Sequence, residues 1–145
     1  MKNDRNVLNP DAFDFVLTNE LKRALRSQNF VTLVLMEPRG GQPAAAVRDI
    51  AGLAGGELRE TDMLATDATS VWMVLLDADL QNSTGVIKRV MSRLEHYQFP
   101  TPVEIAVGAA CCPTHGADVE TLKRVAASAR TARARRDPRG NAHAK

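Results

Sequence analysis

The chain has little cysteine, no long apolar run and only a small net charge. Its only two cysteines, Cys111 and Cys112, are adjacent, and a vicinal pair rarely forms a disulfide and lacks the spacing of metal ligands. We expect both to be small, buried apolar side chains. No stretch approaches the roughly 18 apolar residues of a membrane span, and the polar N-terminus has no signal core. These features predict a cytoplasmic domain with no membrane partner.

The composition and length indicate one globular domain. The 145 residues are 44% hydrophobic and 25% charged, which is typical of soluble globular proteins. A chain of this length buries about two-thirds of the surface of its unfolded form, so it needs neither a disulfide nor a metal ion for stability. The formal net charge of +2 is too small to indicate a nucleic-acid partner. We expect no cofactor.

Apolar periodicity and turn residues predict alternating helices and strands. Asn9-Pro10 is a typical helix start, because asparagine caps helices and proline suits the first helical position. The apolar run from Phe30 to Met36 is typical of a buried central strand. The prediction is a helix beginning at residue 10, a strand at 30–36, a helix at 44–53, strands at 62–66 and 71–76, a helix at 82–97, a strand at 103–111 and a helix at 118–136. This order favours a ferredoxin-like α+β fold with a central, mostly antiparallel sheet flanked by helices.

Two patterns make specific predictions about packing. Phe13, Leu17, Leu21 and Leu25 recur at i, i+4 spacing, which predicts one core-facing stripe on the first helix. Gly108 lies in the middle of a predicted strand, which indicates that another backbone approaches closely there.

The two ends of the chain are expected to differ from its middle. Residues 1–8 are polar and aperiodic, which predicts a flexible N-terminus before a domain at 9–136, and residues 137–145 are predicted to be a disordered tail. The last predicted helix is rich in cations, which favour the negative C-terminal end of a helix dipole. The alternative, nucleic-acid binding, lacks aromatic residues for base stacking. The cations are Lys123, Arg124, Arg130, Arg133, Arg135 and Arg136, with Arg139 after the helix.

Three segments together resemble a known family. They are Arg59-Glu60-Thr61-Asp62, the hairpin that follows at 62–76, and the strand at 103–110 with Pro113, Gly116 and Asp118 after it. Their order and spacing resemble the GGDEF domain, the fold of diguanylate cyclases, over residues 10–136. The resemblance implies the nucleotidyl-cyclase (GGDEF) variant of the ferredoxin-like fold.

The hairpin departs from that family where the family carries its chemistry. At the position of Gly-Gly-Asp/Glu-Glu-Phe the chain has Ala68-Thr69-Ser70-Val71-Trp72. The resemblance implies that a metal-binding acid is missing from the hairpin, because neither serine nor valine replaces an anionic ligand. Glu37, at the end of the first strand, could stand in for one other acid. We therefore expect a degenerate GGDEF domain with no catalytic residue, no metal ligand and no enzymatic activity.

A second family site is retained in part. Many GGDEF domains bind cyclic di-GMP at an inhibitory site that uses Arg-x-x-Asp before the hairpin and an arginine in the next helix. Arg59 and Asp62 match the first part, and Arg89 falls at the third position, with Arg93 as a substitute. An arginine fork can grip a phosphate or a guanine edge, and an aspartate can accept hydrogen bonds from guanine. The alternative is an ordinary surface ion pair between Arg59 and Asp62.

Three functional hypotheses follow. The first is a non-catalytic signalling module that binds an unidentified signalling protein and cyclic di-GMP at Arg59, Asp62 and Arg89. The second is a nucleotide-independent scaffold, with a homodimer left open. The third, a residual enzyme, depends on Glu37 alone.

Overall fold

The computed structural model describes residues 7–133 of the chain as one mixed sheet with helices on both faces. The elements follow the order predicted from the sequence, with one short strand added at each end. They are β1 (Val7–Leu8), α1 (Pro10–Ser27), β2 (Val31–Arg39), α2 (Pro43–Gly55), β3 (Met63–Thr66), β4 (Val71–Leu76), α3 (Leu80–Glu95), β5 (Glu104–Cys112), α4 (Val119–Ser128) and β6 (Thr131–Arg133).

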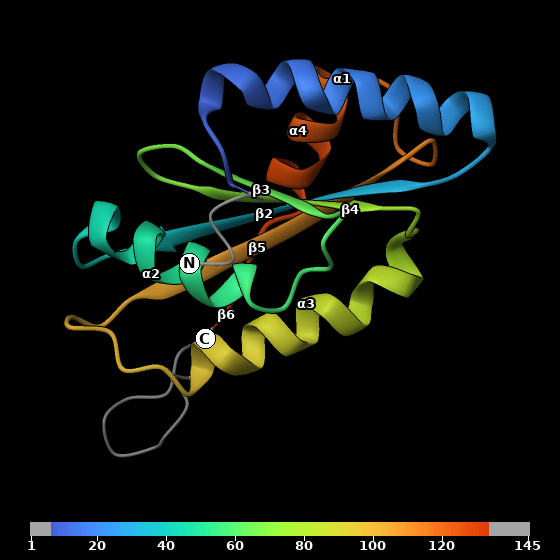
Figure 1. The fold of residues 1–145 in the computed structure, drawn as a ribbon. Helices are drawn as coiled ribbons and strands as arrows, with labels where there is room; N and C mark the ends of the chain where they lie inside the picture. The colour runs from blue at the N-terminus through green and yellow to red at the C-terminus, as the bar shows by residue number, and fades with distance from the viewer. Residues whose placement is uncertain (1–6, 134–145) are drawn as a thin grey trace.

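The sheet has the strand order β1-β3-β4-β2-β5-β6. Among the strands of residues 7–133, β1 and β3 are the one parallel pair, and the other neighbours are antiparallel. Figure 1 shows α1 and α4 on one face of the sheet and α2 and α3 on the other. The predicted α+β architecture, a mostly antiparallel sheet flanked by helices, is confirmed. No helix among residues 7–133 is long and apolar enough to cross a membrane.

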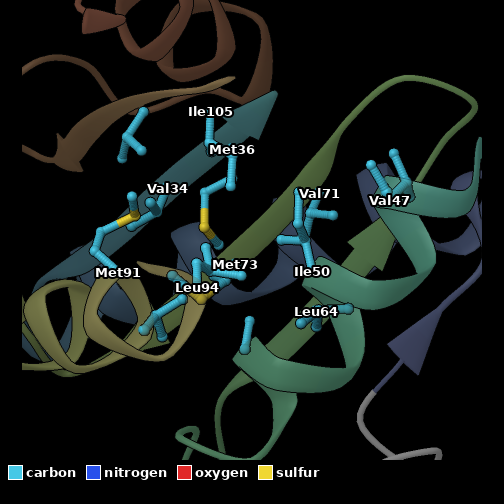
Figure 2. Close-up of a cluster of buried hydrophobic side chains, with 14 of the residues drawn as sticks. Val34, Met36, Val47, Ile50, Leu64, Val71, Met73, Met91, Leu94 and Ile105 are labelled. Carbon is cyan, nitrogen blue, oxygen red and sulfur yellow. The ribbon is translucent and has the colours of Figure 1, made fainter. Parts of the chain in front are cut away.

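The central strand β2 is buried on both sides, which explains its continuous apolar run. Val34 and Met36 pack under α2 and α3 with Ile50 and Leu94 (Figure 2). The alternate residues of β2 face the other way and pack under α1 and α4. Adjacent side chains on a strand point to opposite faces, so one strand supplies both cores.

The first helix begins as predicted but buries a slightly different stripe. Asn9 accepts a hydrogen bond from the Ala12 amide at 2.8 Å, which is the expected cap. Phe13, Leu17 and Leu21 are buried, whereas Leu25 is 45% exposed. An i, i+4 series drifts by about 40° per step, because a helix turns about 100° per residue. After three such steps the side chain has left the core face, and Ala24 takes the position predicted for Leu25.

The prediction for the last helix is wrong beyond residue 128. The α4 helix ends at Ser128, and the chain then forms β6, which pairs with residues 105–107 of β5. The Ala- and Arg-rich sequence has a high helix propensity, but the open edge of β5 offers hydrogen-bonding groups that override it. Consequently Arg130 lies outside the helix and Arg133 lies in β6. Arg135 and Arg136 lie outside the described residues.

The N-terminal prediction also needs a correction. Val7 and Leu8, the last two residues of the segment 1–8 predicted to be flexible, form a strand paired with Leu64 and Ala65 of β3. Residues 1–6 lie outside the described residues. The edge of β3 would otherwise expose unpaired backbone groups, and β1 covers part of it. The predicted tail at 137–145 lies outside the described residues.

Another backbone segment lies close to Gly108, as predicted. A Cβ atom at this position would overlap the Ala126 carbonyl oxygen and would lie 3.0 Å from the Arg130 amide nitrogen. The end of α4 therefore rests directly on β5, and only glycine leaves the space for it. Cys111 and Cys112 follow on the same strand and are buried and unbridged, as predicted.

Candidate functional site

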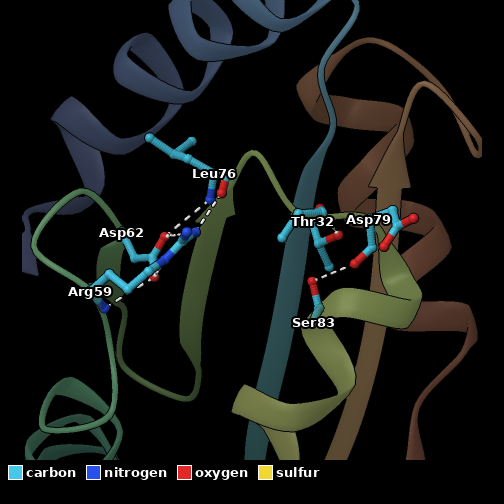
Figure 3. Close-up of polar contacts among 7 residues, drawn as sticks. Thr32, Arg59, Asp62, Leu76, Asp79 and Ser83 are labelled. Atoms are coloured by element: carbon cyan, nitrogen blue, oxygen red, sulfur yellow. Dashed lines mark hydrogen bonds and ion pairs between the residues drawn. The ribbon is translucent and has the colours of Figure 1, made fainter.

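The Arg59–Asp62 pair lies in the loop between α2 and β3. The Asp62 side chain has no exposed surface, whereas that of Arg59 is 55% exposed. Asp62 Oδ2 accepts hydrogen bonds from the Arg59 amide and Nε, both at 3.1 Å. Asp62 Oδ1 accepts from Arg59 Nη2 at 3.0 Å and from the Leu76 amide at 3.1 Å. Figure 3 shows that this network joins the loop to the end of β4.

This pair is more than an ordinary surface ion pair. A buried carboxylate needs several donors to offset its lost hydration, and Asp62 has four of them. The hydrogen bond with Asp62 raises the pKa of Arg59 against the opposing effect of partial burial, and the charges of Asp62 and Asp77 raise it further. Arg59 Nη2 also donates to the Leu76 carbonyl oxygen. Asp62 therefore fixes the position of the Arg59 guanidinium group.

The carboxylate of Asp62 is fully occupied by the protein. Both carboxylate oxygens carry two protein donors, and the side chain is inaccessible. In this conformation Asp62 offers no exposed surface to a ligand, and its contacts hold Arg59 in place.

Two further arginines meet close to this loop. Arg89 Nε and Arg93 Nη1 of α3 each lie 3.2 Å from a different carboxylate oxygen of Glu57. Both arginine side chains are more than half exposed, at 58% and 53%, and Glu57 is only 17% exposed. Glu57 precedes Arg59 by two residues, so the segment 57–62 contacts all three guanidinium groups through Glu57 and Asp62. We call Arg59, Arg89 and Arg93 the arginine surface.

The sequence indicated the Arg59–Asp62 pair but gave no sign of Glu57 as the partner of Arg89 and Arg93. Arg59 and Asp62 are three residues apart, which is visible as a motif. Glu57 is 32 residues from Arg89 and 36 from Arg93, and no local pattern connects them. Only the packing of α3 beside the end of α2 brings these residues together.

The β3–β4 hairpin is closed by an aspartate and has no glycine in its turn. Asp67 and Ser70 pair through a backbone hydrogen bond of 3.0 Å, and Asp67 Oδ1 accepts from the Thr69 amide at 2.9 Å. Positive φ angles within residues 7–133 occur at other positions, not at Ala68 or Thr69. The turn therefore has an ordinary backbone conformation, held by an Asx-type contact. Ser70 is buried.

Trp72 on β4 joins the hairpin to both helices of its face. Its ring centroid lies 6.3 Å from that of Phe13 on α1. The Lys123 Nζ atom of α4 lies 5.6 Å from the Trp72 centroid and 5.3 Å from that of Phe13. The same Nζ lies 2.8 Å from an Asp14 carboxylate oxygen. Trp72 is partly buried and packs against the apolar cluster under α1 and α4.

Glu37 is engaged by the protein's own arginines. It lies near the end of β2, where Arg130 Nη1 donates to its carboxylate and Arg39 Nη2 lies 3.7 Å away. Among residues 7–133, no three Asp, Glu, His or Cys side chains are grouped closely enough to hold a metal ion. Glu37 therefore has cationic neighbours where a metal site would need further acids.

Comparisons with known proteins show what this arrangement resembles. No family model matches the chain, and no curated protein matches it. Solved structures do match. A DGC protein from Thermotoga maritima has a TM-score of 0.75 and 14% identity, over 86% of this chain and 96% of that one. The diguanylate cyclase SiaD from Pseudomonas aeruginosa, in complex with its activator SiaC, has a TM-score of 0.67 and 19% identity, over 83% and 52%.

A third structure carries a ligand. The GGDEF domain of DgcB from Caulobacter crescentus, in complex with c-di-GMP, has a TM-score of 0.72 and 13% identity, over 84% of this chain and 82% of that one. At identities this low the likeness shows the fold. The chain has the fold of GGDEF domains, as predicted from its sequence.

Proposed function

We propose that this chain is a non-catalytic, GGDEF-like signalling module that binds cyclic di-GMP at the arginine surface and responds through a protein partner. The observation that carries the proposal is the grouping of three half-exposed guanidinium groups around the segment 57–62, with Arg59 held in place by the buried Asp62. A positioned arginine such as Arg59 binds anions well because less conformational freedom is lost on binding. The likeness of fold to DgcB, which was solved with c-di-GMP, supports this choice of ligand.

The chemistry of the ligand suits the arginine surface. Cyclic di-GMP carries two phosphodiesters and two guanine bases. An arginine fork forms paired, charge-assisted hydrogen bonds with phosphate oxygens or with guanine O6 and N7. We assign these contacts to Arg59 and Arg89, with Asp62 holding Arg59 in place. Micromolar affinity corresponds to about 8 kcal/mol, which a few charge-assisted contacts with base stacking can supply.

The hairpin and Glu37 support the non-catalytic part of the proposal. Transfer of a nucleotidyl group needs metal ions to neutralise charge on the triphosphate. The Glu37 carboxylate pairs instead with Arg130, and the hairpin turn carries alanine, threonine and serine. A signalling role without turnover requires a protein partner. The diguanylate cyclase SiaD, part of which has this fold, was solved with a protein partner, its activator SiaC.

Isothermal titration calorimetry with cyclic di-GMP tests the binding proposal. We expect saturable binding with a micromolar Kd, and a loss of at least tenfold in affinity for Arg89→Ala. This variant is preferable to Arg59→Ala, because Glu57 keeps Arg93 as a partner whereas Asp62 would be left buried without its main one. Arg124→Ala on α4, an exposed arginine on the opposite face of the sheet, is the matched control and should bind like the wild type.

A parallel titration with GTP and Mg²⁺ tests the non-catalytic part. We expect no product after prolonged incubation. Turnover that disappears in Glu37→Ala would refute this part and favour a residual enzyme. The absence of cyclic di-GMP binding up to millimolar concentration would refute the binding part, and the chain would then be a nucleotide-independent scaffold.

A further inference from the structure

Glu57 contacts both arginines of α3. Its Oε1 lies 3.2 Å from Arg89 Nε, and its Oε2 lies 3.2 Å from Arg93 Nη1. Each guanidinium group therefore uses part of its hydrogen-bonding capacity on the protein's own carboxylate. Because the two arginine side chains are more than half exposed, solvent or a ligand can compete with Glu57 for them.

The position of Glu57 makes this carboxylate dependent on the arginines. It follows the last turn of α2, and its amide donates to the Ala54 carbonyl oxygen at 2.9 Å. A helix C-terminus carries partial negative charge, which disfavours an acid beside it. The side chain is also mostly buried, which costs hydration. Arg89 and Arg93 compensate for both effects.

A carboxylate and a phosphodiester present arginine with a similar pair of anionic oxygens. Glu57 thus occupies the same donors that a phosphodiester would use. We propose that Glu57 is an internal competitor that sets the affinity of the arginine surface for its phosphodiester ligand. This inference rests on the proposed function, since it concerns the same ligand at the same surface.

The expected size of the effect follows from the exposure of the pairs. When part of the protein holds its arginines on Glu57, the apparent Kd is the intrinsic Kd divided by the fraction in which they are available. Ion pairs with half-exposed partners are weak. The two pairs of Glu57 therefore leave Arg89 and Arg93 available to a ligand in roughly one-third to one-tenth of the molecules. Glu57→Gln removes the charge and preserves the shape, so we expect cyclic di-GMP to bind about three- to tenfold more tightly.

A second variant separates competition from simple loss of charge. Glu57→Asp retains the charge, but its side chain is one methylene shorter and cannot span both arginines at their present separation. It should bind between the wild type and Glu57→Gln. Glu95→Gln, an exposed acid on the same helix as Arg89 and Arg93, changes the net charge equally and should leave the Kd within twofold. Thermal unfolding of each variant verifies that it is folded.

Calorimetry with cyclic di-GMP on the wild type and the three variants tests the inference. Tighter binding by Glu57→Gln, with Glu95→Gln unchanged, supports it. Binding by the wild type with an equal or weaker affinity in Glu57→Gln overturns the inference and leaves the proposed function standing. Equal tightening by Glu95→Gln overturns it as well, because net charge would then explain the gain. Absence of binding by both the wild type and a folded Glu57→Gln overturns the inference together with the proposed function.

Discussion

Replacing Asp62 by alanine should destabilise the protein through two backbone amides more than through the ion pair. The Arg59 side chain is 55% exposed, so water can replace Asp62 as the partner of its guanidinium group and little is lost there. The Arg59 and Leu76 amides lose a charged acceptor in partly buried positions. Hydrogen bonds to charged groups contribute about 1.5–3 kcal/mol each. In the wild type, burying the Asp62 carboxylate costs hydration, and this cost offsets part of the contribution of the hydrogen bonds. We therefore expect Asp62→Ala to lower the free energy of unfolding by about 2–4 kcal/mol.

Urea denaturation measures this loss as a shift in the midpoint at constant m-value. For a domain of this size, about 3 kcal/mol corresponds to a Tm lower by roughly 6–12 °C. Asp62→Asn retains one side-chain oxygen as an acceptor and should lose about half as much. Glu95→Gln, at an exposed position, should lose nothing measurable. A loss below about 0.5 kcal/mol for Asp62→Ala would refute the reasoning, because burial would then cost as much as the four hydrogen bonds contribute.

Three further predictions follow from the packing, the thiols and one helix cap. Gly108→Ala should lower the free energy of unfolding by more than about 2 kcal/mol, because its Cβ would collide with a backbone carbonyl oxygen of α4; an unchanged urea midpoint would contradict this. Burial raises the pKa of the Cys112 thiol, and its neighbour Cys111 adds to the effect, so a thiol reagent should label neither cysteine in the native protein and both after unfolding. Hydrogen bonds from Thr121 hold the pKa of Asp118 below its ordinary value, so the carboxylate stabilises the fold above that value and loses its contribution as the pH falls through the lowered pKa. Midpoints measured between pH 7 and pH 3 should therefore decline less in Asp118→Asn than in the wild type.

The order of the elements was predictable because local patterns determine it. The cap at Asn9, the apolar run of β2 and the hairpin at 63–76 each have a signature within a few residues. Leu25 was assigned to the core because a strict four-residue step ignores the drift of the helix. The end of α4 was missed because its Ala- and Arg-rich continuation favours helix locally, and only the free edge of β5 makes a strand the better choice.

The candidate site was predictable only where its residues are close in sequence. Arg59 and Asp62 form a visible motif, but burial of the carboxylate depends on the Leu76 amide, which belongs to another strand. Sequence spacing therefore shows the pair but neither the burial of Asp62 nor its hydrogen bond to the Leu76 amide. Glu57 has no motif at all, and its partners come from a helix more than thirty residues further along the chain.

Trp72 is the only tryptophan of the chain, and its ring lies against Phe13 with the Lys123 ammonium group above both rings. The environment of the indole is therefore formed by residues from an early, a central and a late part of the polypeptide, namely Phe13, Trp72 itself and Lys123. The three parts come together only when long loops have closed, which is the slow event in the folding of mixed sheets. The intrinsic fluorescence of this protein thus reports global closure of the chain, and it does so without an added label.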